Sequence, residues 1–188
     1  MFLLRFMRLS QAINFTIFFL LSHNSASWGQ NIMNNDYLIS FHDTIKDEYG
    51  YRSGTGDTII PLGKYEFCFT DTFRTFAIVS KSSFGVVVID RNENILYEVF
   101  PFENGPDYSS DGFFRIIVDN KIGFANSATG KILINPRFGC AFPFENGLAR
   151  VCNNCTTQSD GEHSTWFSDY WYYIDKTGKK VDKTKTIK

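Results

Sequence analysis

Two closely spaced cysteines, Cys152 and Cys155, offer the clearest chemistry in the sequence. Cysteines three positions apart can close a local disulfide, form a redox pair, or supply two ligands to a metal ion. A redox pair requires a helix start in a βαβ setting, and neither pattern is present. Zinc requires four ligands, and the neighbourhood adds His163 with Asp160 or Glu162. We expect a disulfide between Cys152 and Cys155, with no metal ion and no cofactor.

The other two cysteines, Cys68 and Cys140, lie in segments that align without gaps, with Val79 on Val151. If these segments are copies two positions apart in a regular β array, strand spacings of ~4.8 Å separate the two cysteines by about 10 Å. That distance is beyond the reach of a disulfide. We expect Cys68 and Cys140 to be buried free thiols, which pack as small apolar side chains.

Residues for catalysis are scarce. The chain has three histidines, His23, His42 and His163, and it contains no Gly-x-Ser-x-Gly, His-Glu-x-x-His or phosphate-loop motif. Glu103 and Glu145 recur, but they belong to a repeated segment, and a carboxylate beside a turn can accept N–H groups structurally. The sequence therefore predicts a protein that is not an enzyme.

A polar and then aromatic insertion, residues 156–170, is the strongest candidate for binding. Three aromatic residues, two within the insertion and one just after it, are the binding candidates: Trp166, Phe167 and Trp171. Aromatic anchors dominate interfaces, and long loops often carry function. The alternative is that Trp166 and Phe167 fold back as a cap over the core.

The segment 101–105, Pro-Phe-Glu-Asn-Gly, returns unchanged as residues 143–147. An identical pentapeptide used twice indicates an internal repeat. An Asn-Gly or Asp-Gly pair before an apolar run predicts a tight turn that feeds a strand, as at Asp111-Gly112 and Asn146-Gly147. Repeats of this size cannot bury their aromatic residues alone, so we expect Phe102, Phe124 and Phe144 to pack against a following repeat.

A second mark is a glycine followed by an aromatic residue or Val, as in Gly50-Tyr51, Gly85-Val86 and Gly123-Phe124, with Tyr172-Tyr173 in the matching place. A polar turn follows each mark, and a glycine in such a turn supplies a positive φ. Strands are therefore predicted on both sides of each turn and after each Asn-Gly-like pair. They cover residues 49–53, 58–60, 76–79, 86–89, 95–99, 113–118, 122–125, 132–134, 148–152 and 171–174, with weaker strands at 37–41 and near Val181.

The third of these segments, residues 123–151, resembles the WG-containing repeat, a family found mainly in bacterial proteins. The resemblance rests on the order Gly-Phe, Thr-Gly-Lys, Ile-Asn-Pro, then Phe-Glu-Asn-Gly-Leu-Ala-Arg-Val, and it covers residues ~48–181. Trp appears only in the fourth segment, as Trp171-Tyr172 without its glycine. The resemblance implies a fold of β repeats, and the family has no shared catalytic residues to carry over.

The chain of 188 residues is predicted to be all-β, with one domain at residues 31–188 behind a secretory signal peptide, a helix within residues 1–30. Arg5 and Arg8 followed by a short apolar run and small residues give that leader pattern. The domain is an array of three to four antiparallel repeats of about three strands, either solenoid-like or partly propeller-like. The repeats cover residues 48–82, 83–120, 121–155 and 170–183.

The net charge is −1, and cleavage after residue 27 would remove two arginines, leaving 17 basic against 20 acidic residues, or −3. Such a balance lacks the basic stripe of nucleic-acid binding, and no stable membrane span remains after the leader is removed. We expect an extracytoplasmic, non-catalytic module that binds a protein or a cell-surface polymer. The alternatives are a structural, envelope-associated protein without a discrete ligand, and an enzyme or metal site within residues 152–171.

Overall fold

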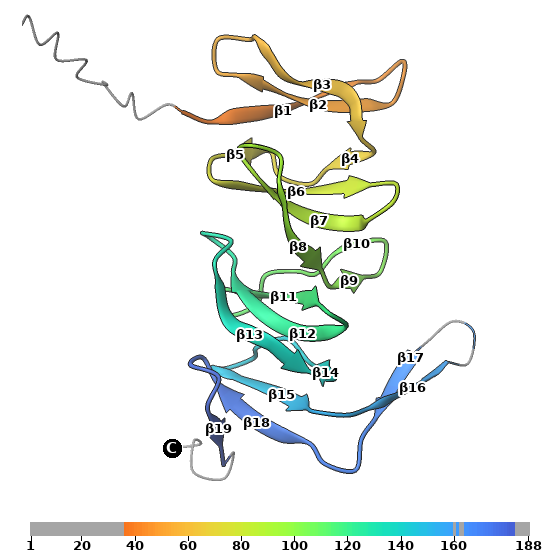
Figure 1. Cartoon of the computed structure of the whole chain (residues 1–188), viewed down its shortest axis with the longest axis vertical. Coiled ribbons are helices and arrows are strands. Elements are labelled where there is room, and N and C mark those ends of the chain that lie inside the picture. The colour runs from red at the N-terminus through yellow and green to blue at the C-terminus, as the bar shows by residue number, and fades with distance from the viewer. Residues whose placement is uncertain (1–35, 160, 162–163, 183–188) are drawn as a thin grey trace, which may run out of the picture. The chain divides into compact units, whose positions relative to one another are not determined.

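The computed structural model describes residues 36–159, 161 and 164–182, and these residues form strands and connecting turns with no helix (Figure 1). All strand pairs are antiparallel and none of the sheets closes on itself. The described residues all belong to one compact unit. The predicted signal peptide lies outside the described residues. The prediction of an all-β protein is confirmed.

Nineteen strands are assigned in the described part of the chain. They are β1 Leu38–Asp43, β2 Glu48–Ser53, β3 Thr58–Tyr65, β4 Phe67–Cys68, β5 Thr72–Phe73, β6 Phe76–Lys81, β7 Gly85–Asp90, β8 Ile95–Val99, β9 Pro101–Phe102, β10 Gly105–Pro106, β11 Phe113–Val118, β12 Lys121–Asn126, β13 Ile132–Phe138, β14 Cys140–Ala141, β15 Leu148–Cys152, β16 Thr156–Ser159, β17 Ser164–Phe167, β18 Tyr172–Asp175 and β19 Lys180–Val181. Every strand predicted above has its counterpart here.

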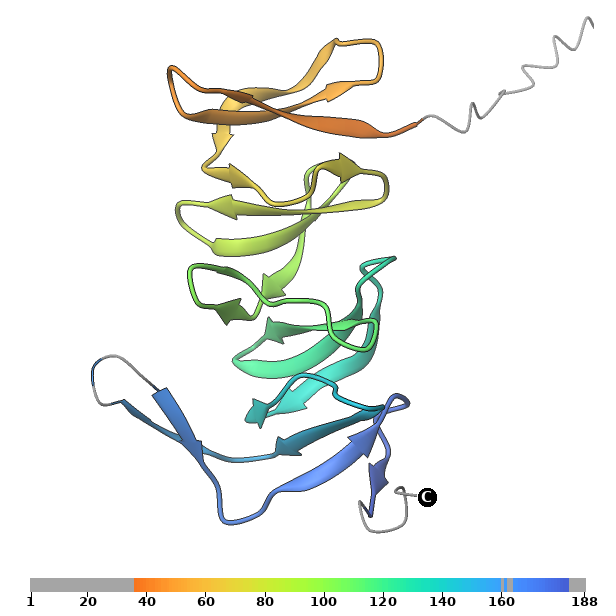
Figure 2. The same cartoon turned by 180° about the vertical axis from the view of Figure 1, so that it is seen from behind.

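The strands form three larger sheets and two separate hairpins. The sheet orders are β3-β2-β1-β5, then β13-β12-β11-β8-β7-β6-β4, then β14-β15-β18-β19, with β9–β10 and β16–β17 as two-stranded hairpins. Within the described residues these sheets follow one another in chain order, as Figures 1 and 2 show from opposite sides. The β16–β17 hairpin projects away from the neighbouring strands (Figure 1).

Four hairpins, β2–β3, β7–β8, β12–β13 and β18–β19, end in similar turns. In each hairpin, the backbone N–H of the last strand residue before the turn donates to a carbonyl oxygen on the far side of the turn, at 2.8–3.1 Å. These four residues are Ser53, Asp90, Asn126 and Asp175. The position with positive φ is Gly56, Glu93, Gly130 or Gly178, at 100°, 63°, 68° and 80°. Glycine takes this conformation without steric cost, whereas Glu93 adopts it against its preference.

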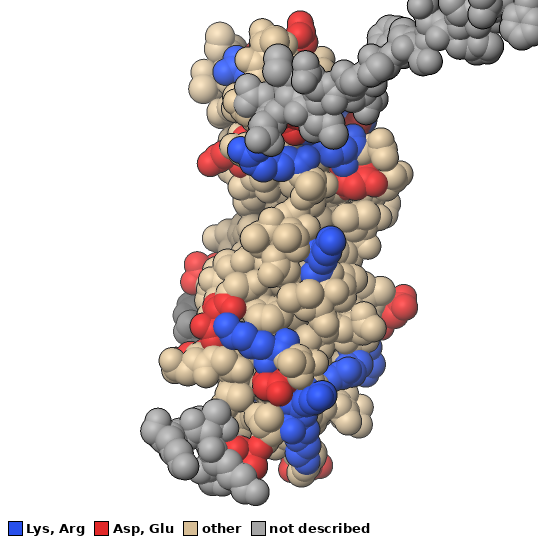
Figure 3. Space-filling model, turned by 90° about the vertical axis from the view of Figure 1, so that its left-hand side faces the viewer, with Lys and Arg blue, Asp and Glu red and all other residues tan. Residues whose placement is uncertain are grey.

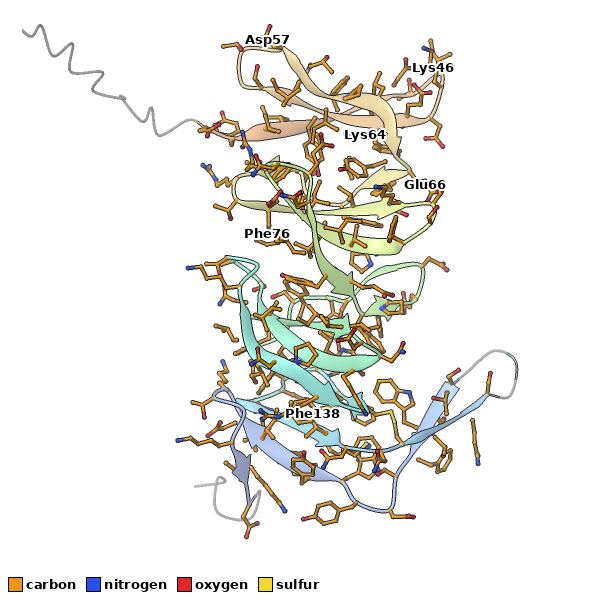
Figure 4. The ribbon with its side chains drawn as sticks, viewed as in Figure 1. Lys46, Asp57, Lys64, Glu66, Phe76 and Phe138 are labelled. Carbon is orange, nitrogen blue, oxygen red and sulfur yellow. A yellow bond between two sulfur atoms is a disulfide. The ribbon has the colours of Figure 1, made fainter. Side chains whose placement is uncertain are left out.

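The buried side chains fill the spaces between successive sheets. One cluster joins Tyr51 and Phe73 of the first sheet to Ala77 and Val79 of β6. Another joins β11–β13 to the β14–β15–β18 sheet, with Phe138 fully buried at its centre (Figure 4). Alternate residues of one strand face the core in a half-buried sheet, as the burial pattern of β3 shows around its buried Ile60.

The predicted equivalence of Gly85 with Gly50 and Gly123 is wrong. Each of these strands has a shift in register beside one pair: Tyr51 with Ile60, Val88 with Tyr97, and Phe124 with Ile134. The residues just before Tyr51 and Phe124 are the two glycines, and the residue just before Val88 is Val87. Val87, and not Gly85, therefore corresponds to Gly50 and Gly123. A Cβ on Gly50 or Gly123 would lie 2.6 Å from a carbonyl oxygen of the partner strand. Gly85 instead closes the β6–β7 turn with a φ of 69°.

The two copies of the repeated pentapeptide adopt different structures, so their predicted equivalence is also wrong. Residues 101–106 form the β9–β10 hairpin, in which Glu103 has a φ of 51° and the Phe102 side chain is 41% exposed. In the second copy, Phe144 is 1% exposed and packs 4.6 Å from Phe113 between ring centroids. Phe102 therefore does not fill a core, contrary to expectation, and identical local sequences follow their tertiary surroundings.

Asp111-Gly112 and Asn146-Gly147 were predicted to form tight turns that feed a strand, and this prediction is confirmed. The φ angles are 53° and 87° in the first pair, and 52° and 82° in the second. Isolated bridges enclose both turns, from Ser110 to Phe113 and from Glu145 to Leu148. The Asp111 carboxylate accepts a hydrogen bond from the Gly147 N–H at 2.6 Å, so the two turns lie next to each other.

Candidate functional site

The predicted binding residues do not all lie together. Trp166, on β17, lies between the rings of Phe100 and Phe142, at centroid distances of 5.7 and 5.5 Å, and packs against the buried core. Trp171, just before β18, is 5.4 Å from Phe142. Phe167 is 47% exposed, and its neighbour in β17, Trp166, points to the core side. The structure brings Trp166 and Trp171 together around Phe142 and leaves Phe167 apart.

Arg150, on β15, completes this cluster. Its guanidinium carbon lies 4.4 Å from the centroid of the Phe142 ring and 4.7 Å from that of Trp171. Cations are attracted to the faces of aromatic rings, and most strongly to tryptophan. The Arg150 side chain is exposed, and no hydrogen bond or ion pair of its guanidinium is found among the described residues. We call Phe142, Arg150, Trp166 and Trp171 the Arg150 surface.

The same pairing of arginine and phenylalanine occurs earlier in the chain, between Arg115 and Phe100. The guanidinium carbon of Arg115 lies 4.2 Å from the centroid of the Phe100 ring. Arg115 is buried, and its Nη2 and Nε atoms donate to the two oxygens of the Asp107 carboxylate at 2.5 and 2.9 Å. Its Nη1 donates to the Ala141 carbonyl oxygen at 3.1 Å. Because both charges are buried, hydrogen bonds to each are required to offset their desolvation.

Arg150 and Arg115 were not among the site residues predicted from the sequence. The signal was present as a phenylalanine before each Pro-Phe-Glu-Asn-Gly segment and an arginine after each Asn-Gly-like turn. Asp107 could not be assigned a role from sequence, because it lies in an inserted loop that returns to Phe100 only in the folded chain. The Asp107 N–H donates to the Phe100 carbonyl oxygen at 2.9 Å.

The cysteine predictions need correction. The disulfide joins Cys140 to Cys155, with a Cα–Cα distance of 6.1 Å, and Cys152 is a buried free thiol together with Cys68. Cys140 and Cys152 are opposite each other in the β14–β15 pair, while Cys68 pairs with Val79 and Ala141 pairs with Val151. Cys68 therefore corresponds to Ala141, and the gapless alignment was off by one residue at this strand.

Gly139 explains how Cys155 reaches Cys140. A Cβ on Gly139 would lie 2.5 Å from the Asn153 carbonyl oxygen, so only glycine lets the chain after β15 cross so closely. The Gly139 N–H also donates to the Cys152 carbonyl oxygen at 2.9 Å. The chain after Cys152 thus folds back over β14, which brings Cys155 to Cys140 instead of to its near neighbour in sequence.

The sulfur atoms of Cys140, Cys152 and Cys155 all lie within 4.8 Å of one another. Three thiolates suit soft metal ions, but two of these sulfurs form the disulfide. The other ligands considered for zinc, Asp160, Glu162 and His163, lie outside the described residues. In the disulfide form the cluster ties the start of the 156–167 hairpin to β14.

Two of the cavities on the described surface are lined by polar and aromatic groups that could contact a ligand. One of about 300 Å³ lies beside Phe76 (Figure 4) and is lined by hydroxyl groups and charged residues, including Thr70, Arg74 and Ser127. The other, of about 620 Å³, is lined by residues 170–173 and 180–182. Here the Lys180 ammonium group contacts the hydroxyl of Tyr170 and lies 5.4 Å from the centroid of Tyr172.

Shifted pKa values have structural causes. Burial raises the pKa of Tyr51, Tyr65 and Tyr97. Hydrogen bonds within the hairpin turns lower the pKa of two carboxyl groups, that of Asp90 through Asn94 and that of Asp175 through Thr177. These groups position turns and fill the core. On the face shown in Figure 3, basic and acidic side chains are interspersed among uncharged residues.

Comparison with known proteins matches residues 122–154 to the WG containing repeat. This segment runs from β12 through β15 and includes Phe142 and Arg150. The chain therefore carries a WG-containing repeat, as its sequence predicted. No curated protein and no solved structure matches the chain. In the part that the structure describes, no helix is long and apolar enough to cross a membrane.

Proposed function

We propose that this chain is an exported, non-catalytic β-repeat protein that binds a protein partner through the Arg150 surface. The repeats are three to four copies of one module stacked in a solenoid-like order. Support comes from the recurring hairpin turns at Ser53, Asp90 and Asn126, which are 37 and 36 residues apart in number, and from the family match of one of them. Repeats of this kind share cores with their neighbours and often present surfaces for binding.

The observation that carries the binding role is the composition of the Arg150 surface. Tryptophan, tyrosine and arginine supply most of the binding energy at protein interfaces, because they combine large apolar area with polar groups. Arg150 is exposed on β15, and Phe142, Trp166 and Trp171 are partly buried around it. The Arg150 guanidinium stacks on two aromatic rings and has no ion pair among the described residues, so its charge is available to a partner.

Placement outside the cytoplasm is supported by the leader pattern and by the disulfide between Cys140 and Cys155. Disulfides persist in oxidising compartments and are rare in the cytosol. A cell-surface polymer is the second ligand class, because the hydroxyl-rich cavity beside Phe76 offers donors and acceptors of the kind that bind sugars. The two ligands use different surfaces and are separable by variants.

The test is affinity capture from the extracytoplasmic fraction of the source organism, with three baits compared. The wild type and a control variant, Phe84→Ala at an exposed turn, are expected to retain the same partner, and Trp171→Ala is expected to lose it. Melting temperatures establish that all three baits are folded. Equal retention by Trp171→Ala and wild type would exclude the Arg150 surface, and no retained partner for any bait would favour the purely structural role.

A further inference from the structure

Asp107 makes a complete set of contacts with the Phe100–Arg115 pair. The Asp107 N–H donates to the Phe100 carbonyl oxygen, and Asp107 Oδ2 accepts the Arg115 backbone N–H at 2.7 Å. Both carboxylate oxygens also accept from the guanidinium group. The aspartate therefore uses one backbone acceptor, one backbone donor and the arginine fork, with the Phe100 ring beneath the guanidinium. Such bidentate, charge-assisted contacts are among the stronger hydrogen bonds in proteins.

The Phe142–Arg150 pair presents the same groups. The Phe142 N–H donates to the Arg150 carbonyl oxygen at 2.9 Å, as the Phe100 N–H donates to the Arg115 carbonyl oxygen at 3.0 Å. The N–H and C=O of a strand residue point to the same side, so the Arg150 N–H also faces Phe142. Within the described residues, no acceptor is found for the Arg150 N–H and no donor for the Phe142 carbonyl oxygen.

A third pair, Phe69 and Ile78, lies earlier in the chain. There too the strand N–H that faces the phenylalanine donates to an oxygen of a side chain. The Phe69 N–H donates to the Ile78 carbonyl oxygen, and the Ile78 N–H donates to Thr70 Oγ1 at 2.9 Å. After Phe142 comes Pro143, which has neither a side-chain acceptor nor an N–H. Among the described residues, the chain thus supplies its own acceptor at Ile78 and Arg115, and none is found at Arg150.

We propose that the Phe142–Arg150 pair binds an aspartate in an extended peptide segment of a partner protein, in the way that Arg115 binds Asp107. This inference rests on the proposed function and names the partner chemistry. The ligand donates its backbone N–H to the Phe142 carbonyl oxygen, and its carboxylate accepts from the Arg150 N–H and guanidinium. The Trp171 ring, which contacts the Arg150 guanidinium, covers the bound carboxylate from one side. It keeps water away from the hydrogen bonds between the carboxylate and Arg150, which strengthens them.

A peptide is favoured over an acidic polysaccharide by the groups that this site presents. They are the Arg150 guanidinium and two backbone groups, the Phe142 carbonyl oxygen and the Arg150 N–H, and in the Asp107 example the same groups bind a peptide. A uronic acid can offer a carboxylate to Arg150 and a hydroxyl to the Phe142 carbonyl oxygen, but it has no backbone N–H placed beside its carboxylate as in Asp107. The internal example is itself a peptide: residues 104–110 carry Asp107 and lie beside Phe100.

The test uses the full chain and a synthetic peptide with the sequence of residues 104–110. The amide resonance of Arg150 is expected to shift on titration with this peptide, whereas the Arg115 amide stays unchanged. The peptide with Asp107→Asn is expected to bind about tenfold or more weakly, since charge-assisted hydrogen bonds are lost. The Arg150→Gln protein is expected to lose a similar factor, and Arg52→Gln, an exposed arginine over Phe41, keeps wild-type affinity.

Three results would overturn the assignment: no shift at Arg150, equal binding of the aspartate and asparagine peptides, or binding of a uronate oligomer but not of the peptide. The peptide comparison needs only the wild-type protein, so it stands even if Arg150→Gln fails to fold. If the peptide fails while partner capture still depends on Trp171, the aspartate site is wrong and the binding function stands. If both fail, the binding function is wrong as well.

Discussion

The hydroxyl group of Tyr97 donates a hydrogen bond to the carbonyl oxygen of Gly130 at 2.5 Å. Tyr97 lies on β8 and Gly130, 33 residues further along the chain, in the β12–β13 turn, so this bond joins two different hairpins. The Tyr97 side chain is buried, and a Cβ on Gly130 would lie 2.7 Å from the ring of Phe76. The turn is therefore held closely against the neighbouring strands.

Replacing Tyr97 with Phe should lower the free energy of unfolding by about 1 to 2 kcal/mol, because the Gly130 carbonyl oxygen loses its donor while the ring packing is kept. Urea denaturation measures the change. Tyr108→Phe is the matched control, since Tyr108 is 48% exposed and its ring contacts Phe102 only at the surface. Equal stability of the two variants would mean that water replaces the Tyr97 hydroxyl without cost.

Asp107→Ala should destabilise the chain by about 3 to 5 kcal/mol, because the Arg115 charge would stay buried without its partner. The side chains of Arg115 and Asp107 are 5% and 1% exposed. Lys64→Ala removes an ion pair with Glu93 whose side chains are 44% and 27% exposed, and it should cost about 1 kcal/mol or less. Unfolding midpoints in urea compare the two, and similar losses would contradict the burial argument.

Non-reducing peptide mapping should find a disulfide between the peptides that contain Cys140 and Cys155. Cys68 and Cys152 should be alkylated only after unfolding, because both thiols are buried. The mapping is done with an alkylating agent present during unfolding, which prevents thiol exchange among three sulfurs so close together. A Cys152–Cys155 crosslink under these conditions would restore the pairing that the sequence predicts.

Stability should fall between about pH 9 and pH 11 through Cys68. Burial raises the pKa of this thiol from 9.0 to about 11. In that interval the unfolded chain loses the Cys68 proton and the folded chain keeps it, so the folded state is destabilised as pH rises. The drop in urea midpoint between these pH values should be smaller in Cys68→Ala. The buried tyrosines act in the same direction in both proteins, so an equal drop would show that Cys68 contributes nothing.

Strand positions could be predicted from the sequence because each strand has its own turn residues and apolar run. The turns at Gly56, Gly130 and Gly178 are specified locally, by the positive φ that glycine permits. The weak strand near Val181 was predicted for the same reason and is present as β19. Local rules therefore sufficed wherever the structure depends on neighbouring residues.

The errors arise where distant residues decide the structure. Phe102 and Phe144 have identical neighbours, but the loop that contains Asp107 draws residues 101–106 into a hairpin of their own, through Arg115. Cys155 pairs with Cys140 because Gly139 lets the chain cross β14. The β16–β17 hairpin was missed because β16 is exposed and polar throughout, without the alternation that marks a half-buried strand.

Amide hydrogen exchange should distinguish Arg150, the arginine of the proposed site, from Arg115, which is already bound to Asp107. The Arg115 N–H donates to the buried Asp107 carboxylate at 2.7 Å, so it should exchange only through opening of the surrounding structure. The Arg150 N–H lies in an equivalent backbone position and has no such acceptor in the part of the chain that the structure describes, so it should exchange many times faster. The Ile78 N–H, bound to Thr70 Oγ1, should be protected like that of Arg115. Slow exchange at Arg150 in the isolated chain would mean that its N–H is already bound, leaving no place for a partner's aspartate.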